Sequence, residues 1–235
     1  MTTNWIDFWT RPPSRKAESN IKSGDTRRIT VEQIRARLAG TRPPPDPLRV
    51  SLPLEVPRWP ARLQQKLTSD LKPAGVLIPI IGRGGELSVL LTERAADLKH
   101  HASQISFPGG RMEHGDADIC ATALRETHEE VGIRPSQVEV AGYLDPAPTV
   151  TGYAVTPVVG LVRPGFTVVV DRGEVAEAFE VPLSFLMDLD NQHHGVREYE
   201  GVTVPIIEFN YRHWRIWGAT AGMLIALRSR LIISS

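Results

Sequence analysis

Residues 107–133 constrain the fold of this chain more than any other segment. They begin with a Pro-Gly-Gly turn and a short polar loop, and then show the spacing of a helix from about Asp116 or Asp118 to Val131. Gly132 should end that helix, because glycine adopts the left-handed backbone conformation at low cost. The segment therefore predicts a turn, a loop and a helix in the middle of the chain.

On a helical wheel this helix has an apolar face and an acidic face. The apolar face should pack on the core, and it comprises Cys120, Leu124, Thr127 and Val131. Glu126, Glu129 and Glu130 gather on the opposite side, which we expect to face solvent. Glu126 and Glu130 are four residues apart and repel each other, and Arg125 offsets only part of this charge. The sequence thus predicts a patch of carboxylates.

A bound divalent cation would relieve this repulsion. Hard cations such as Mg²⁺ prefer carboxylate oxygens, so glutamates at this spacing can hold one against a phosphate-bearing substrate. An isolated acidic segment is more often a solvated helix face, so the surrounding residues have to decide between the two interpretations.

The surrounding residues match a known pattern. Its members are Gly110, Asp116, Arg125-Glu126-Thr127, Glu129-Glu130 and Gly132-Ile133, and together they resemble the signature box of the Nudix hydrolases. The family usually has glutamate where Asp116 stands, and a loop one residue shorter before the Arg-Glu pair. Both departures lie in the loop, and every acidic position of the helix matches.

Residues 90–110 are similar to the extended signature of one branch of that family, the coenzyme A pyrophosphatases, which shares the aspartate and the longer loop. Residues 151–160, 174–183 and 217–223 also look like segments of this branch. Ser103 stands where the branch usually has glycine, and Lys99 where arginine is commoner. These two differences bear on the choice of substrate.

The resemblance implies hydrolysis of the pyrophosphate bond of coenzyme A or its thioesters, with Mg²⁺ or Mn²⁺ as cofactor. The products would be adenosine 3′,5′-bisphosphate and 4′-phosphopantetheine. Glu126 and Glu130 would be metal ligands, with Glu129 as a third ligand or bound through a water, and Arg125 would orient them. The general base would be either Glu130 or Glu174.

Cations near the turn are candidates for binding the substrate. Arg94 and Lys99 can pair with phosphates, although solvated surface charges are an equally good interpretation of both. The Gly109-Gly110 turn can bring backbone close to the metal site.

Two other functions compete with this one. The first is the same chemistry on another nucleoside diphosphate derivative, such as ADP-ribose or NADH. The second is a Nudix-shaped binding module without catalysis, which would have no need to keep three repelling glutamates together.

Composition narrows the cellular setting. With 27 basic and 27 acidic side chains the formal net charge is zero, so nothing calls for nucleic acid as a partner. Cys120 is the single cysteine; it cannot form an intrachain disulfide, and we expect it to be a small buried hydrophobe. No secretory signal and no membrane-spanning run is present, so we expect a cytoplasmic protein without a membrane partner.

Residues 1–72 form a proline-rich extension, and residues 73–235 form the Nudix-like domain. In the extension we expect helices over residues 31–38, with Thr30 as N-cap, and over 61–71, joined by an extended linker. Trp5, Phe8 and Trp9 make either a strap on the domain's own surface, which we favour, or the contact of a homodimer.

The domain should have an α/β fold, a Nudix-like α/β/α sandwich with a mixed sheet. Strands are expected over residues 76–81, 87–92, 138–144, 155–161, 166–170, 196–199, 202–209 and 212–217. Residues 174–179 should lead into a short helix that has Pro182 in its first turn and ends near Asp188, and a last helix should cover 218–230.

Overall fold

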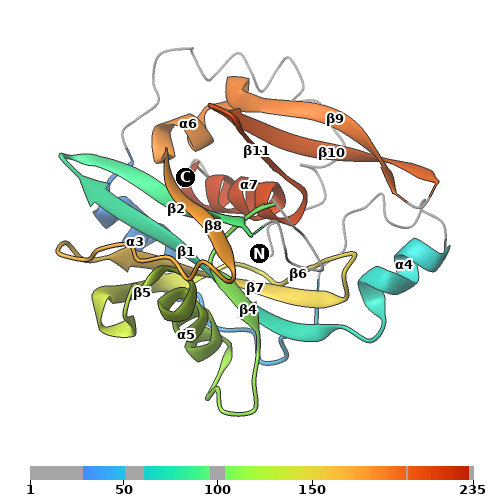
Figure 1. Ribbon diagram of the computed structural model, residues 1–235, viewed down its shortest axis with the longest axis horizontal. Helices are drawn as coiled ribbons and strands as arrows, with labels where there is room; N and C mark the ends of the chain where they lie inside the picture. The colour runs from blue at the N-terminus through green and yellow to red at the C-terminus, as the bar shows by residue number, and fades with distance from the viewer. Residues whose placement is uncertain (1–28, 51–60, 96–103, 200, 233–235) are drawn as a thin grey trace.

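The computed structural model describes residues 29–50, 61–95, 104–199 and 201–232 (Figure 1). The expectations for the aromatic cluster Trp5, Phe8 and Trp9, for Lys99 and Ser103, and for linker residues 51–60 fall outside these residues.

Two helices precede the first strand. Helix α3 (Val31–Leu38) begins after Thr30, as predicted, and the Thr30 hydroxyl accepts a hydrogen bond from the Gln33 N–H at 3.2 Å. Helix α4 (Ala61–Thr68) is shorter than the predicted span of 61–71. The chain turns at Asp70, whose φ of 55° is incompatible with a continuing helix.

Helix α3 packs on the domain that follows. Ile34 and Leu38 are fully buried in the same hydrophobic cluster as the last helix. Arg35 donates to Glu139 at 2.7 and 3.0 Å, which ties the helix to an edge of the main sheet. This part of the extension therefore contributes to the hydrophobic core.

The main sheet has eight strands and is mixed. Its strands are β1 (Lys72–Arg83), β2 (Glu86–Arg94), β3 (Ile105–Ser106), β4 (Gly109–Arg111), β5 (Val138–Tyr143), β6 (Ala147–Pro148), β7 (Tyr153–Val162) and β8 (Val175–Pro182). The central order is β3-β2-β1-β7-β5, with β4 paired to β1, β6 to β7 and β8 to β2. Strands β1 and β7 are parallel, whereas β1 is antiparallel to β2 and β4. The predicted hairpin of β1 and β2 is confirmed.

Helices cover both faces of this sheet, as Figure 1 shows. Leu77 and Ile81 of β1 belong to the cluster under helix α5 (Ile119–Val131), whereas Ile78 belongs to the cluster under helix α7 (Gly218–Ile232). Successive side chains of a strand point to opposite faces, so a strand buried on both sides needs a continuous apolar run. The predicted α/β sandwich is therefore confirmed.

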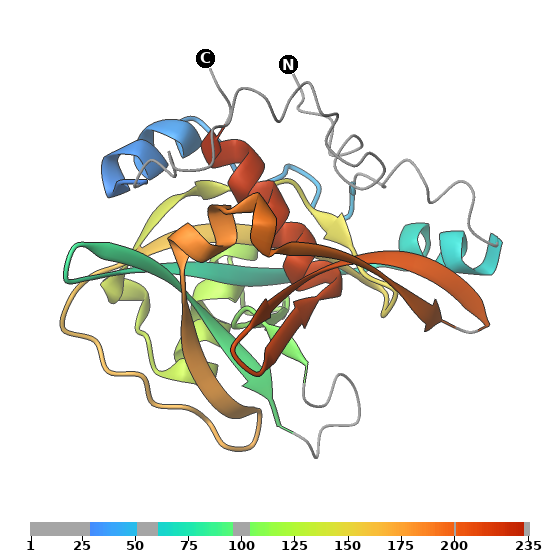
Figure 2. The ribbon, with the colours of Figure 1, turned by 90° about the horizontal axis from the view of Figure 1, so that it is seen from above.

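A second sheet of three strands lies beside the main one. It has the order β11-β10-β9 and consists of β9 (Gln192–Tyr199), β10 (Val202–Tyr211) and β11 (Trp214–Trp217). Figure 2 shows the β9–β10 hairpin reaching toward α4, where Leu63, Val204 and Ile206 form a small cluster. The rings of Phe179 and Trp214 stack at 3.7 Å and join β8 to β11.

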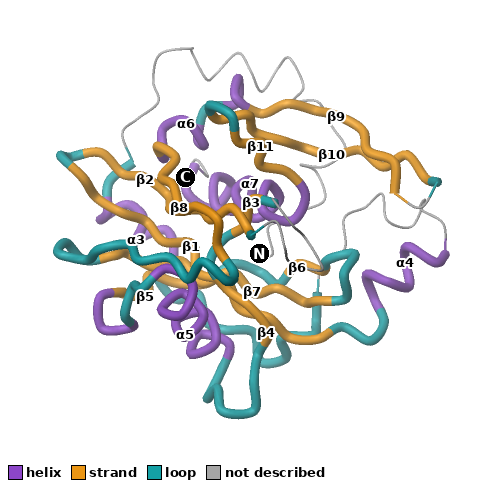
Figure 3. The backbone as a smooth tube through the Cα atoms, in the orientation of Figure 1, coloured by secondary structure: helices purple, strands orange, loops and turns teal. Residues whose placement is uncertain are grey.

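In the second half of the chain one expected strand is absent and one strand forms that was not expected. Residues 166–170 are not a strand but a loop (Figure 3). Their apolar side chains cover the end of α5, and the N–H groups of Val169 and Asp171 donate to the carbonyls of Val131 and Glu130. Residues 175–182 form strand β8, which was not expected. The short helix expected from Pro182 to about Asp188 is confirmed as α6 (Leu183–Met187), and the 3₁₀ turn η3 (Leu189–Asn191) follows it. No helix in the part of the chain described above is long and apolar enough to cross a membrane.

Candidate active site

Helix α5 begins and ends where the sequence predicts. Asp118 is its N-cap, and its carboxylate accepts a hydrogen bond from the Ala121 N–H at 2.8 Å. Gly132 follows the last residue at φ 75°, and its N–H donates to the His128 carbonyl at 3.0 Å. The 3₁₀ turn η2 (Pro135–Gln137) then leads into β5. Both ends of the acidic helix are therefore fixed by local contacts.

The buried face of α5 is rotated relative to the predicted one. Its buried residues are Ile119, Thr122, Ala123, Thr127, Glu130 and Val131, whereas Cys120 and Leu124 are only half-buried. Cys120 is thus not the fully buried hydrophobe that we expected. The helix packs against both β1 and the short strand β4, so it buries a wider face than a helical wheel predicts.

Glu130 departs most clearly from the expected solvent-facing position. Its side chain is 2% exposed, whereas that of Glu129 is 55% exposed. The backbone N–H of Gly109 donates to Glu130 at 3.2 Å, and Arg94 of β2 lies 3.4 Å from the same carboxylate. Strands β2 and β4 therefore cover Glu130 on the face of α5 that the helical wheel predicts to be exposed to solvent.

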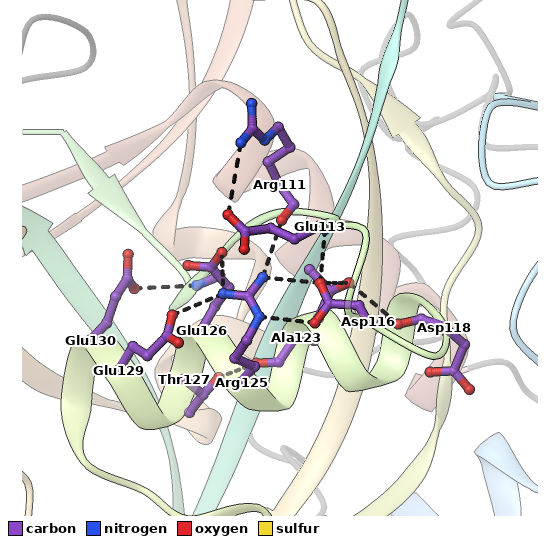
Figure 4. Close-up of polar contacts among 12 residues, drawn as sticks. Arg111, Glu113, Asp116, Asp118, Ala123, Arg125, Glu126, Thr127, Glu129 and Glu130 are labelled. Carbon is purple, nitrogen blue, oxygen red and sulfur yellow. Dashed lines mark hydrogen bonds and ion pairs between the residues drawn. The ribbon is translucent and has the colours of Figure 1, made fainter.

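Arg125 holds the remaining carboxylates together (Figure 4). Its guanidinium donates to both oxygens of Asp116 at 2.9 and 3.0 Å. It also donates to Glu126 at 3.0 Å and to Glu129 at 2.8 Å. The hydrogen bond with Arg125 is the largest cause of a pKa of Asp116 far below its usual range. Because a planar guanidinium fixes the positions of its partners, Arg125 orients two glutamates at once.

The turn residue Gly110 lies directly against Glu126. A Cβ atom at this position would stand 2.5 Å from the Glu126 carboxylate, which is closer than side-chain atoms can approach. A side chain at residue 110 would therefore displace the Glu126 carboxylate from the position in which Arg125 holds it. Burial is the largest cause of a raised pKa for Glu126; Glu129 and Glu174 raise it further, while Arg125 opposes the shift.

Glu174 joins this cluster from the loop that precedes β8. Its backbone carbonyl accepts a hydrogen bond from the Ala95 N–H at 2.9 Å, directly after β2. Its charge raises the pKa of both Glu126 and Glu130. The structure therefore brings together all the site residues that the sequence predicts, except Lys99, which lies outside the described residues.

Sequence reasoning did not find the structural partner of Arg125. Asp116 attracted notice only as a departure from the usual box, although its side chain is 6% exposed and binds the guanidinium with both oxygens. The pair spans a loop and a helix, so no periodic spacing reveals it. The Thr122 hydroxyl also donates to Asp116 at 2.9 Å.

The cluster has the donors that a divalent cation needs. Glu126 and Glu130 both have raised pKa values, so burial and mutual repulsion outweigh the two nearby arginines. No three His, Cys, Asp or Glu side chains among the described residues are gathered as a ready-made metal site. Arg125 and Arg94 instead hold the carboxylates in separate directions. Carboxylates whose pKa stays raised beside these arginines fit a hard divalent ion.

The pKa of Glu130 makes the stability of the metal-free protein dependent on pH. Burial raises this pKa to about 8 from an ordinary value of 4.5, against the opposing charge of Arg94. Between these values the folded chain binds more protons than the unfolded chain, so the free energy of unfolding falls as the pH rises. Glutamine does not titrate, so Glu130→Gln does not lose stability in this way. Its free energy of unfolding relative to that of the parent should therefore rise by about 1 to 3 kcal/mol from about pH 5 to about pH 9.

Urea unfolding in chelator at several pH values measures this difference. The exposed Glu86→Gln is the matched control and should follow the parent at every pH. Parallel curves for the parent and Glu130→Gln would contradict the raised pKa.

A mixed sheet between helices, with an acidic helix that follows a glycine-rich strand, is the architecture of the Nudix hydrolases. The chain belongs to this family of enzymes, since the model of the NUDIX domain matches residues 71–199, more than half of its length.

Proteins from enterobacteria are similar over most of their length. The Uncharacterized Nudix hydrolase NudL of Citrobacter koseri is 42% identical over 157 residues, which is 67% of this chain and 81% of that protein. The protein of the same name from Cronobacter sakazakii is 40% identical over 178 residues, or 73% and 92% of the two chains. Among solved structures, the binary complex of Ap4A hydrolase from C. elegans has a TM-score of 0.41 at 20% identity, over 48% of this chain and 81% of that one.

Proposed function

We propose that this Nudix hydrolase cleaves the pyrophosphate bond of coenzyme A or its thioesters, giving adenosine 3′,5′-bisphosphate and 4′-phosphopantetheine or its acyl derivative. The observation that carries the proposal is the ion pair of Arg94 with Glu130 at 3.4 Å. It joins residues 90–110, which resemble the coenzyme A branch, to the acidic helix of the Nudix box. Two described residues of that segment, Arg94 and Gly109, thus contact the carboxylate of Glu130.

Glu126 and Glu130 would hold Mg²⁺ or Mn²⁺, with Glu129 as a third ligand. When bound, such ions neutralise pyrophosphate oxygens and activate water for attack. Glu130 is buried and Glu126 is partly buried beside β4, whereas Glu129 is exposed and can turn toward the site without disturbing the core.

The chain's own residues have separate tasks in this reaction. Arg125 is a positioning residue, because its contacts with Asp116, Glu126 and Glu129 fix the directions of two ligands. The proton of the attacking water goes to Glu174 or to Glu130. Glu174 is the better placed of the two to move its side chain, since it lies in a loop that is held through its backbone: its N–H donates to the Asp171 carbonyl at 3.1 Å, and its carbonyl accepts from the Ala95 N–H.

Arg94 and the Gly109-Gly110 strand would bind the substrate. Arg94 is partly exposed and lies at the end of β2. When a cation binds the Glu130 carboxylate, Arg94 can leave that carboxylate and bind a phosphate oxygen of the substrate. Lys99 belongs to the same segment of sequence and remains a candidate for a second phosphate contact. The two glycines leave backbone open to a close approach by the pyrophosphate.

Product analysis tests the proposal. The protein is incubated with coenzyme A, ADP-ribose and NADH in parallel, each with Mg²⁺, Mn²⁺ or chelator, and the nucleotides are separated. We expect metal-dependent release of adenosine 3′,5′-bisphosphate from coenzyme A in preference to cleavage of the other two. A preparation of Glu130→Gln excludes a contaminating hydrolase. If only ADP-ribose or NADH is cleaved, the proposed substrate is wrong and the reaction type is retained. If none of the three compounds is cleaved, the proposal is contradicted.

A further inference from the structure

An open groove of about 490 Å³ lies beside β4. It is lined by Lys72, Pro73, Arg111, Met112, Glu113 and His114. The Met112 N–H donates to the Pro73 carbonyl at 2.9 Å, so the loop after β4 is fastened to the start of β1. The groove therefore has a backbone frame that does not depend on its charged side chains.

One guanidinium connects the groove to the proposed reaction site. Arg125 donates to the backbone carbonyl of Arg111 at 3.3 Å and to the carboxylate of Glu126 at 3.0 Å. The side chain of Arg111 points away from helix α5, on the other side of the strand from the carboxylates (Figure 4). A ligand that has its pyrophosphate at Glu126 can therefore extend across the edge of β4 into the groove.

The lining favours an anion. Lys72, Arg111 and His114 supply donors, and Glu113 is the one carboxylate among the lining residues. Arg111 lies 3.7 Å from Glu113, with side chains 60% and 56% exposed. Exposed ion pairs of this length contribute little to stability, so Arg111 is free to bind another partner. In the described part of the chain, Lys72 has no ion-pair partner.

A phosphate monoester matches these donors. A guanidinium binds two phosphate oxygens with parallel N–H groups, and a lysine ammonium adds a mobile point charge. We propose that the Lys72–Arg111 groove binds a second phosphate group of the substrate, a monoester on the ribose of its nucleoside. This inference rests on the proposed function, where that group is the 3′-phosphate of coenzyme A, and it makes the groove the element that distinguishes coenzyme A from nucleotides without this phosphate.

The kinetic test compares two substrates that differ only in this group. For the double variant Lys72→Ala/Arg111→Ala, we expect KM for coenzyme A to rise about tenfold or more, while KM for 3′-dephospho-coenzyme A changes less than about twofold. Both replaced side chains are exposed, and the Arg111 carbonyl that binds Arg125 is retained. Arg163→Ala is the matched control, because Arg163 is also an exposed cation. Lys72 pairs with Tyr153 at the start of β7, whereas Arg163 follows the other end of that strand. An equal change for both substrates would overturn the inference.

A binding measurement separates this inference from the proposed reaction. Calorimetry with adenosine 3′,5′-bisphosphate and with AMP, in the presence of Mg²⁺, needs no turnover. We expect the parent and Arg163→Ala to bind the bisphosphate about tenfold tighter than AMP, and the double variant to lose this preference. That result would support the groove even if coenzyme A were not cleaved. Equal affinity of the parent for the two nucleotides would overturn it even if coenzyme A were cleaved.

Discussion

Replacing Glu130 by glutamine is expected to lower kcat about 10³-fold while the chain stays folded. The carboxylate lies at the centre of the site, where it contacts Gly109 and Arg94 and is electrostatically coupled to Glu126 and Glu174. An amide of the same shape keeps an acceptor for the Gly109 N–H, but it provides neither a strong ligand for a cation nor a proton acceptor. Steady-state kinetics at saturating divalent ion, on the substrate found by product analysis, measures the loss.

A helical wheel would explain an intact fold in this variant by a solvent-facing Glu130. The structure gives a different reason. Glu130 is buried, and with a pKa of about 8 it is largely protonated at neutral pH in the metal-free chain. Glutamine therefore imitates its prevailing form, and a thermal melt in chelator near neutral pH should show a melting temperature at least as high as that of the parent. Glu86→Gln should retain both the rate and the melting temperature. Turnover by Glu130→Gln at the parental rate would refute the assignment of the site.

Arg125→Met is expected to destabilise the protein by about 2 to 4 kcal/mol, because it leaves the buried Asp116 carboxylate without its cation. It should also lower kcat, since Glu126 and Glu129 lose the group that orients them. Urea unfolding at neutral pH gives the free energy. A double-mutant cycle with Asp116→Asn isolates the coupling between the two side chains.

An exposed ion pair of similar geometry provides the control. Arg35 also binds a carboxylate, that of Glu139, with two hydrogen bonds, but both side chains are substantially exposed. Arg35→Met should therefore destabilise the protein much less than Arg125→Met does. Equal costs for Arg35→Met and Arg125→Met would show that burial of Asp116 does not strengthen its pair with Arg125.

Elements defined by local rules could be predicted from the sequence. Thr30 marks the start of α3, and Asp118 and Gly132 bound α5, because a cap depends on residues only a few positions apart. The hairpin of β1 and β2 follows from two apolar runs around glycines.

Elements defined by distant partners were predicted wrongly. Residues 166–170 have an apolar run like that of a strand, yet their backbone binds the end of α5 instead of a neighbouring strand. Strand β8 was not predicted at all, because its position depends on an antiparallel pairing with β2, nearly a hundred residues earlier in the chain.

The sequence by itself determined the carboxylates of the site and their spacing along one helix, since a helix places residues three and four apart side by side wherever it lies. Only the tertiary structure decided which of them is buried. Strand β4 pairs with β1 beside α5, and this pairing encloses Glu130, places Gly110 against Glu126 and opens the groove at Arg111. Burial and long-range charge depend on what packs over a helix, and the contact of Arg94 with Glu130 joins residues 36 positions apart. For that reason the pKa of Glu130 and the partner of Arg94 emerge only once the sheet has formed.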